Sequence, residues 1–125
     1  MISLASVQTW LDNYIQAWRT YDRAQIEALY TEDALCYYNP FDEPLRGRDA
    51  ILESWLDNPD DPKSWEASYH PLAVEGHTAV TQGRTTYLNP DGTLRAQFDN
   101  IFVLRFSDDG RVAEFTEWYM QPRRN

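Results

Sequence analysis

The chain has 125 residues and a formal net charge of -9. This length fits one domain spanning residues 1–125, and a hydrophobic share of 42% favours a packed core over disorder. The acidic balance excludes nucleic acid as a partner, because phosphate binding needs clustered Lys and Arg.

The chain contains no sign of membrane insertion or export. No apolar run approaches the roughly 18 residues of a membrane span, and the N-terminus lacks the basic start and apolar core of a signal peptide. The single cysteine, Cys36, leaves no internal disulfide and fits a reducing compartment. We therefore expect a cytoplasmic protein that has no membrane partner.

Helical spacing marks the start of the chain. Apolar residues recur at intervals of three and four and predict an amphipathic helix over residues 4–20. Asp22 is expected to cap a second helix, whose buried stripe would contain Ile26, Leu29 and Tyr30.

A short strand and a proline-containing loop follow these helices. Alternation along the strand would place Tyr37 and Asn39 on one face and Tyr38 on the other. Two prolines end the strand, and a third helix is expected to begin at residues 47–49, with Trp55 on its apolar face.

Strand patterns separated by turn signals occupy the second half of the chain. The predicted strands span residues 65–74, 78–88, 94–106 and 111–120. Helices followed by an antiparallel meander predict an α+β domain, in which three N-terminal helices cover one face of a mostly antiparallel sheet.

The predicted strand over residues 94–106 is apolar on both faces. Asn100 and Phe102 share one face, whereas Ile101 and Val103 share the other. Because the helices can cover only one face, we expect the other face to meet a second copy in a homodimer. The alternative is a face on which scattered apolar residues stay partly exposed.

The familiar signatures of metal and phosphate chemistry are absent from the sequence. His70 and His77 have no carboxylate at ligand spacing beside them, so no metal site is expected. The chain has neither a glycine-rich phosphate loop nor a Gly-x-Ser-x-Gly nucleophile motif. We expect no cofactor.

One carboxylate of the last strand is expected to point inward. Alternation places Glu117 between Phe115 and Tyr119 on one face. Aromatic surroundings should raise the pKa of this carboxyl by desolvation, which suits a general acid or base near neutral pH. The competing interpretation is a buried structural ion pair of Glu117 with Arg84 or Arg105, and the sequence leaves both open.

Four segments and the helix containing Trp18 resemble a known family. The segments cover residues 28–34 (ALYTEDA), 46–51 (RGRDAI), 106–112 (FSDDGRV) and 117–119 (EWY). They are similar to the SnoaL-like proteins of the nuclear transport factor 2-like superfamily. The resemblance implies a cone-shaped domain with a strongly curved sheet and a hydrophobic pocket for a small molecule. It implies no single activity, because this superfamily mixes enzymes, ligand binders and interaction modules.

Comparison with the ketosteroid isomerases of this superfamily concerns three positions. Tyr14 falls where those enzymes carry the tyrosine of an oxyanion hole. Asn39 stands before a proline where they have their catalytic aspartate, and Phe102 aligns with their second aspartate. An amide cannot abstract a proton, so the resemblance does not imply steroid isomerase chemistry.

The limonene-epoxide-hydrolase-like enzymes provide a second comparison. Tyr37 and Asn39 resemble the Tyr-x-Asn that holds their water, and Glu117 is similar in position to the aspartate that activates it. The counterpart of their Arg-x-Asp is Arg84 followed by two threonines. The aspartate, which is the proton donor of that site, is therefore missing here. In the SnoaL-type polyketide cyclases a pocket aspartate is the acid/base, and Glu117 is the candidate for that role here.

Two functions follow as expectations. In the first, an isomerase, cyclase or hydrolase uses Glu117 for proton transfer, or for activating a water held by Tyr37 and Asn39, while Tyr14 or Arg84 stabilises negative charge. In the second, the same fold is a non-catalytic binder of a small hydrophobic molecule or an interaction module. The pocket is expected to be lined by Tyr14, Trp18, Tyr37, Asn39, Trp55, Asn100, Phe102, Phe115, Glu117 and Tyr119.

Overall fold

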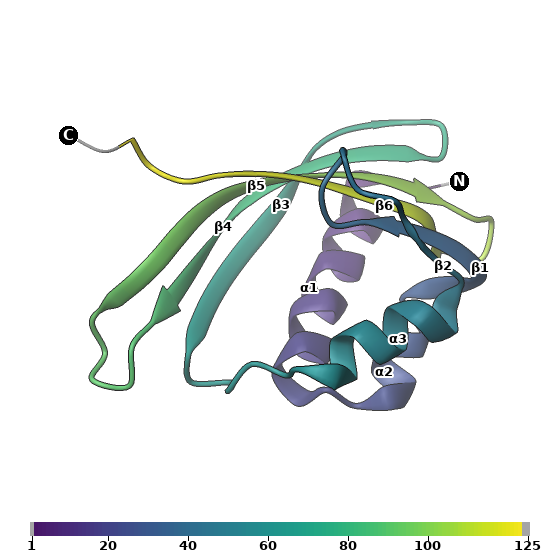
Figure 1. The fold of residues 1–125 in the computed structure, drawn as a ribbon. Helices are drawn as coiled ribbons and strands as arrows, with labels where there is room; N and C mark the ends of the chain where they lie inside the picture. The colour runs from purple at the N-terminus through teal and green to yellow at the C-terminus, as the bar shows by residue number, and fades with distance from the viewer. Residues whose placement is uncertain (1, 124–125) are drawn as a thin grey trace.

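Three helices cover one face of a curved six-stranded sheet in the computed structural model, which describes residues 2–123 (Figure 1). The helices are α1 (Leu4–Thr20), α2 (Arg23–Glu27) and α3 (Arg48–Asp57). The strands are β1 (Tyr30–Tyr37), β2 (Leu45–Arg46), β3 (Trp65–Glu75), β4 (Thr78–Leu88), β5 (Leu94–Phe106) and β6 (Val112–Met120). This architecture is the α+β domain that the sequence predicts.

The sheet has the order β2-β1-β6-β5-β4-β3 and is antiparallel except where β1 lies parallel to β6. The parallel pair joins the N-terminal half of the chain to the C-terminal meander. Because the two strands run in the same direction, the loop that follows β1 lies near the C-terminal end of β6.

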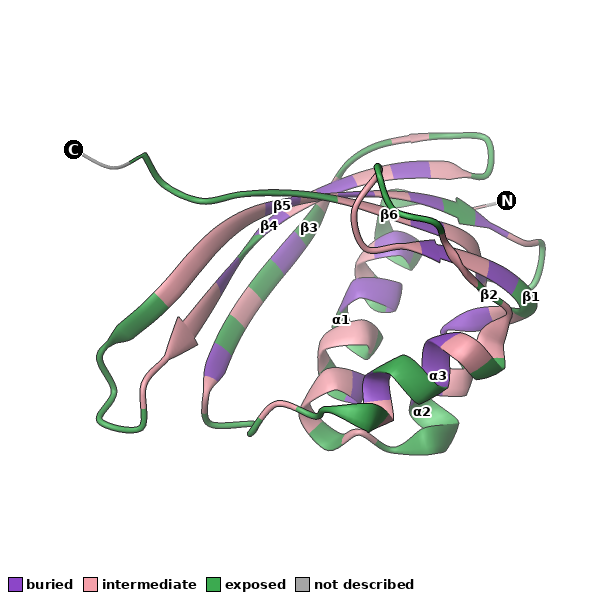
Figure 2. Ribbon diagram, in the orientation of Figure 1, coloured by how far each residue is buried: buried purple, intermediate pink, exposed green. Residues whose placement is uncertain are grey.

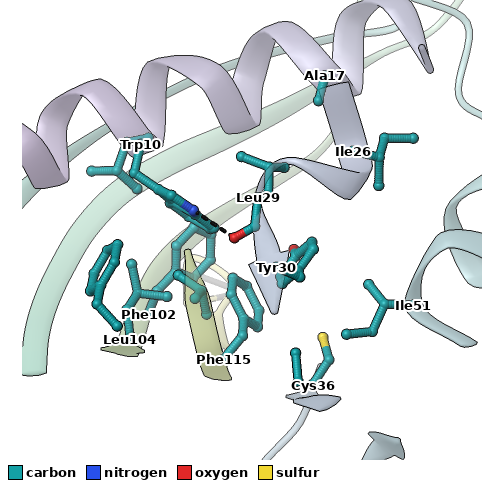
Figure 3. Packing of buried hydrophobic residues seen from close by; sticks show 14 of the residues in the cluster. Trp10, Ala17, Ile26, Leu29, Tyr30, Cys36, Ile51, Phe102, Leu104 and Phe115 are labelled. Carbon is teal, nitrogen blue, oxygen red and sulfur yellow. Dashed lines mark hydrogen bonds between the residues drawn. The ribbon is translucent and has the colours of Figure 1, made fainter. Parts of the chain in front are cut away.

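The second helix is shorter than the sequence predicts. It ends at Glu27, and β1 already begins at Tyr30, which the helical pattern placed on a buried helix stripe. Tertiary contacts override the local pattern here, because the Leu29 carbonyl accepts hydrogen bonds from Val112 N at 2.8 Å and from Trp10 Nε1 at 3.0 Å (Figure 3). The helix therefore ends at Glu27, because the residues that follow it pair with the sheet instead.

The core lies between the helices and the inner face of the sheet, where the buried segments of α1 and the strands face each other (Figure 2). Trp10 from α1, Ile51 from α3 and the sheet residues Phe102, Leu104 and Phe115 belong to one buried cluster, in which Ile51 lies beside Cys36 (Figure 3). Burying a large apolar side chain stabilises the fold by about 1.5–3 kcal/mol relative to leaving it exposed. This cluster fixes the orientation of α1 over β5 and β6.

The pairing of β5 with β6 decides which residues face the helices. Phe102 pairs with Glu117, and this pair faces inward, whereas the neighbouring pair of Ile101 and Trp118 faces outward. The alternation predicted for both strands is therefore confirmed. No helix covers the outer face in the described part of the chain, and Trp118 remains 46% exposed.

Candidate functional site

A cavity of about 420 Å³ opens on the inner face of the sheet, between α1, the loop after β1 and strands β3 to β6. Its walls are largely aromatic, with two carboxylates, two amides and one hydroxyl of threonine between the rings. The lining residues are Tyr14, Trp18, Tyr38, Asn39, Asp42, Tyr69, Thr85, Tyr87, Phe98, Asn100, Phe102, Glu117 and Tyr119.

Glu117 reaches the cavity because its backbone pairs with Phe102 in the middle of the sheet. Its Oε2 accepts a hydrogen bond from Asn100 Nδ2 at 2.6 Å. Arg84 and Arg105, the two possible ion-pair partners, bind Asp99 at 3.4 Å and Glu114 at 3.9 Å instead. None of the salt bridges among the described residues includes Glu117, so the expected alternative of a buried ion pair is wrong.

A chain of hydrogen bonds orients the amide that holds Glu117. Thr85 Oγ1 donates to Asn100 Oδ1 at 3.0 Å, which leaves the amide nitrogen free to donate to Glu117. The Tyr69 hydroxyl lies 2.5 Å from Thr85 Oγ1. Since Thr85 uses its only proton on Asn100, Tyr69 donates to Thr85. Three residues from β3, β4 and β5 thus point an amide donor at one carboxylate oxygen.

Burial dominates the protonation of this carboxyl. Desolvation raises the pKa of Glu117 from its ordinary 4.5 to about 7, while the bond from Asn100 acts in the opposite direction. Burial also raises the pKa of Tyr14 well above its ordinary value of 10.0. The Tyr14 phenol is therefore neutral at physiological pH and available as a hydrogen-bond donor, whereas Glu117 exchanges protons near neutrality.

Seven of the expected pocket residues do line the cavity, but Tyr37 and Arg84 lie on the outer face of the sheet. The parallel register places Cys36 beside Phe115 on the inner face and Tyr37 beside Thr116 on the outer one. A water held jointly by Tyr37 and the cavity residues is therefore excluded. Arg84, paired with Asp99 on the outer face, cannot stabilise charge inside the cavity.

Phe115 and Trp55 lie close to the cavity without lining it. Phe115 is fully buried and supports the cavity floor, with its ring centre 4.8 Å from that of Phe102. Trp55 lines a smaller neighbouring cavity of about 200 Å³, which shares Tyr14, Trp18 and Tyr38 with the main one. These two residues shape the site through packing.

Asn39 lies beyond the end of β1, in the turn that leads to α3. Its Oδ1 accepts a hydrogen bond from Phe41 N at 2.9 Å, so the side chain also stabilises the turn. Strand alternation no longer applies at this position, which is why Asn39 lines the cavity although Tyr37 does not.

Six lining residues are absent from the set that the sequence predicted: Tyr38, Asp42, Tyr69, Thr85, Tyr87 and Phe98. Alternation carried a signal for Phe98, which shares strand parity with Asn100, and pairing places Thr85 opposite Phe98. The inward position of Tyr38 could be predicted only from the register of β1 against β6, and this register has no sequence signature.

Two further classes of site can be assessed on the described residues. No group of three or more His, Cys, Asp or Glu side chains there is arranged to hold a metal ion. No helix within residues 2–123 is long and apolar enough to cross a membrane.

Comparison with solved structures gives the same fold at low sequence identity. An NTF-2 like protein of unknown function from Burkholderia xenovorans has a TM-score of 0.72 and 21% identity, covering 97% of this chain and 88% of that one. A putative ketosteroid isomerase from Kribbella flavida has a TM-score of 0.72 and 19% identity, covering 98% and 83%. A ketosteroid isomerase-like protein from Erwinia carotovora atroseptica has a TM-score of 0.64 and 22% identity, covering 95% and 97%.

Identities this low show the shared fold alone. The comparison with curated proteins gives no significant match. The family model of the SnoaL-like domain, however, matches residues 11–115, from the first half of α1 to β6. Because that match covers far more than half of the chain, this protein belongs to the SnoaL-like domain family.

Proposed function

We propose that the cavity binds a small, largely apolar molecule and that Glu117 moves a proton on it without a cofactor. Aromatic walls with a few convergent polar groups are typical of small-molecule sites. The observation that carries the proposal is the environment of Glu117, an inward carboxylate whose partner is an amide and which forms no salt bridge with any described residue. A carboxyl with a pKa of about 7 is suited to both accepting and returning a proton at neutral pH.

The proposed step is proton transfer at a carbon next to a carbonyl group. The ionised Glu117 takes the proton, so the C–H bond breaks and its electron pair moves onto the carbonyl oxygen to give an enolate. The neutral Tyr14 phenol, which lines the cavity from α1, donates a hydrogen bond to that oxygen. Protonated Glu117 then returns its proton to the same or a neighbouring carbon, which exchanges or isomerises the substrate.

Proton abstraction can be tested before the substrate is known. We expect the protein to accelerate deuterium incorporation from D₂O into at least one of a panel of small cyclic ketones, measured by mass spectrometry. Glu117→Gln keeps the side chain's size and a partner for Asn100 but removes the base, so exchange should fall about 100-fold or more. Glu114→Gln, on the outer face of the same strand, is the matched control. Equal exchange rates for the two variants would rule out Glu117 as the base.

The second candidate function is binding without chemistry. Asn39, at the position that resembles the isomerases' catalytic base, is an amide that also stabilises a turn, and this favours a binding module. A binder would show ligand-induced thermal stabilisation with the compound recovered unchanged. Exchange by the wild-type protein that Glu117→Gln abolishes would exclude this alternative.

We also propose that two copies associate through the outer face of the sheet. Ile101, Val103, Trp118 and Met120 form an apolar strip on this face, where Trp118 is 46% and Met120 74% exposed. The Arg105–Glu114 pair lies on the same face. A two-fold axis can therefore oppose apolar strips and place opposite charges against each other.

Sedimentation velocity tests the association. The wild-type protein should sediment as a dimer at micromolar concentration, and Trp118→Arg should sediment as a monomer, because a charge would be buried in the strip. Phe41→Ser is the control, since it removes a 96% exposed apolar side chain from a loop outside the strip. A monomeric wild-type protein at all concentrations would disprove the dimer.

A further inference from the structure

The cavity has an unusual charge pattern for a site with apolar walls. Glu117 lies among aromatic rings, and Asp42, which is exposed, adds a second carboxylate to the lining. Every charged residue that lines the cavity in the described chain is acidic. A neutral apolar ligand would gain no charge attraction from these carboxylates, and an anionic ligand would be repelled by them.

We propose that the ligand of this cavity is an organic cation, a protonated amine or quaternary ammonium group carried on an apolar body. The faces of Trp, Tyr and Phe rings attract such groups, and within residues 2–123 no cationic side chain pairs with the carboxylate of Glu117. This inference rests on the proposed binding function of the cavity and is independent of proton transfer by Glu117.

Aromatic rings at the edge of the cavity already hold the protein's own cations. The guanidinium carbon of Arg19 lies 3.8 Å from the ring centre of Trp65, which stacks at 3.6 Å on the lining residue Trp18. The guanidinium carbon of Arg95 lies 5.0 Å from the ring centre of Tyr87, another lining residue. Among the described residues, no cation lies over the rings of the other lining residues, such as Phe98 and Tyr119.

The charge balance inside the cavity favours a cation at neutral pH. The titratable groups that the charge of Glu117 influences are Tyr14 from α1, Tyr30 and Cys36 from β1, Tyr69 from β3 and Tyr87 from β4. Tyr38, which follows the end of β1, lines the same cavity. Burial raises the pKa of each, so all are neutral at pH 7. A cation would thus meet the buried carboxyl of Glu117 and the exposed Asp42 at the cavity's edge, and its binding should drive a proton off Glu117 below pH 7.

A pair of probes with the same shape separates the charge from the apolar body. Benzyltrimethylammonium carries a quaternary nitrogen where neopentylbenzene carries a carbon. We expect the cation to bind about tenfold or more tightly than its neutral counterpart, a gain typical of a desolvated cation–π and carboxylate site. Binding is measured by NMR titration at pH 7.5, and the cation's affinity should fall as pH drops from 8 to 5.5.

Three variants locate the charge preference. Glu117→Gln should remove most of the preference for the cation while leaving neopentylbenzene binding within about twofold, which also shows that the variant is folded. Phe98→Leu keeps an apolar wall without a ring face and should weaken only the cation. Glu114→Gln, on the outer face of β6, should change neither affinity.

Tighter binding of the cation, lost in Glu117→Gln, supports the proposal. Equal or tighter binding of neopentylbenzene overturns it and leaves the cavity as a site for neutral apolar molecules. Failure of both probes to bind up to their solubility limits overturns the cationic ligand and also counts against ligand binding by this cavity.

Discussion

Two glutamates on β6, three residues apart, show how the two faces of one sheet differ. Glu117 faces the helices, among aromatic rings, with the Asn100 amide as its partner. Glu114 faces outward and lies 3.9 Å from the guanidinium of Arg105, whose side chain is 67% exposed. The same functional group thus meets desolvation on one face and a solvated ion pair on the other.

The difference shows that position in the sheet, more than residue type, decides which carboxylate has catalytic potential. An exposed ion pair such as Arg105–Glu114 contributes at most about 1 kcal/mol to stability. Burying a carboxyl without a cation opposes folding once the group ionises, and the surrounding core must compensate for it. The inner face therefore contains both the apolar core that stabilises the domain and the carboxyl of Glu117, which destabilises it when ionised.

The largest expected effect is a loss of stability when a large apolar side chain is removed from the inner face of the sheet, compared with the outer face. Phe102→Ala should lower the free energy of unfolding by about 3–5 kcal/mol, because Phe102 is 1% exposed and fills the space under the cavity. Its neighbour Ile101 faces outward, so Ile101→Ala should cost only about 1 kcal/mol in the monomer. Urea unfolding at a concentration where sedimentation shows monomers measures both. Equal losses would mean that the outer face is packed as tightly as the core.

The next effect is a pH dependence of stability caused by Glu117. Its pKa is about 7 in the folded protein against an ordinary 4.5 for the unfolded chain. Between these values the folded state binds more protons than the unfolded state, so the free energy of unfolding falls as pH rises from 4.5 to 7. Glu117→Gln removes this loss and should be more stable than wild type at pH 8, by roughly 3 kcal/mol.

Thermal or urea unfolding of both proteins from pH 4 to pH 8 tests this prediction. The advantage of Glu117→Gln should disappear at pH 4, where the wild-type carboxyl is protonated in both states. Glu114→Gln serves as the matched control for removing one carboxylate from β6. A Glu117→Gln variant less stable than wild type at pH 8 would show that the charged form is well solvated in the folded protein.

The inner face of β5 and β6 could be predicted from the sequence because both strands alternate strictly. Period-two alternation placed Asn100, Phe102 and Glu117 together, and the structure pairs these strands in a register that keeps them on one face. Helices α1 and α3, the four C-terminal strands and the turns between them follow from equally local patterns, whereas the end of α2 does not. Where local preference and tertiary packing agree, the sequence is sufficient.

The loop side of the cavity could not be predicted in the same way. Tyr37 and Tyr38 are chemically alike, and only the pairing of Cys36 with Phe115 decides which of them faces inward. The bond of Asn100 to Glu117 likewise depends on Thr85 and Tyr69, which lie on two other strands. Contacts between distant segments leave no periodic signal in a single sequence.

The smallest expected change in stability concerns Gly83, the residue that lets the Tyr69 side chain reach Thr85. Tyr69 pairs with Gly83 across β3 and β4, and a Cβ at Gly83 would collide with the Tyr69 ring and the Ser68 carbonyl oxygen. The glycine thus makes room for the ring to lie across β4. Gly83→Ala should cost about 1–3 kcal/mol of stability through overpacking.

Gly83→Ala should also change the pKa of Glu117, because the hydrogen-bond chain connects Tyr69 to this carboxyl. A purely steric defect at Gly83 would leave that pKa unchanged. If the Tyr69 ring moves, Thr85 loses its donor and Asn100 is held less firmly, so the carboxylate loses stabilisation and the pKa of Glu117 should rise further. The pKa can be followed by NMR of the Glu117 carboxyl carbon. Gln82→Ala, which alters the outer face of the same strand, should leave that pKa unchanged. A changed stability with an unchanged Glu117 pKa would mean that Asn100 keeps its orientation without the tyrosine.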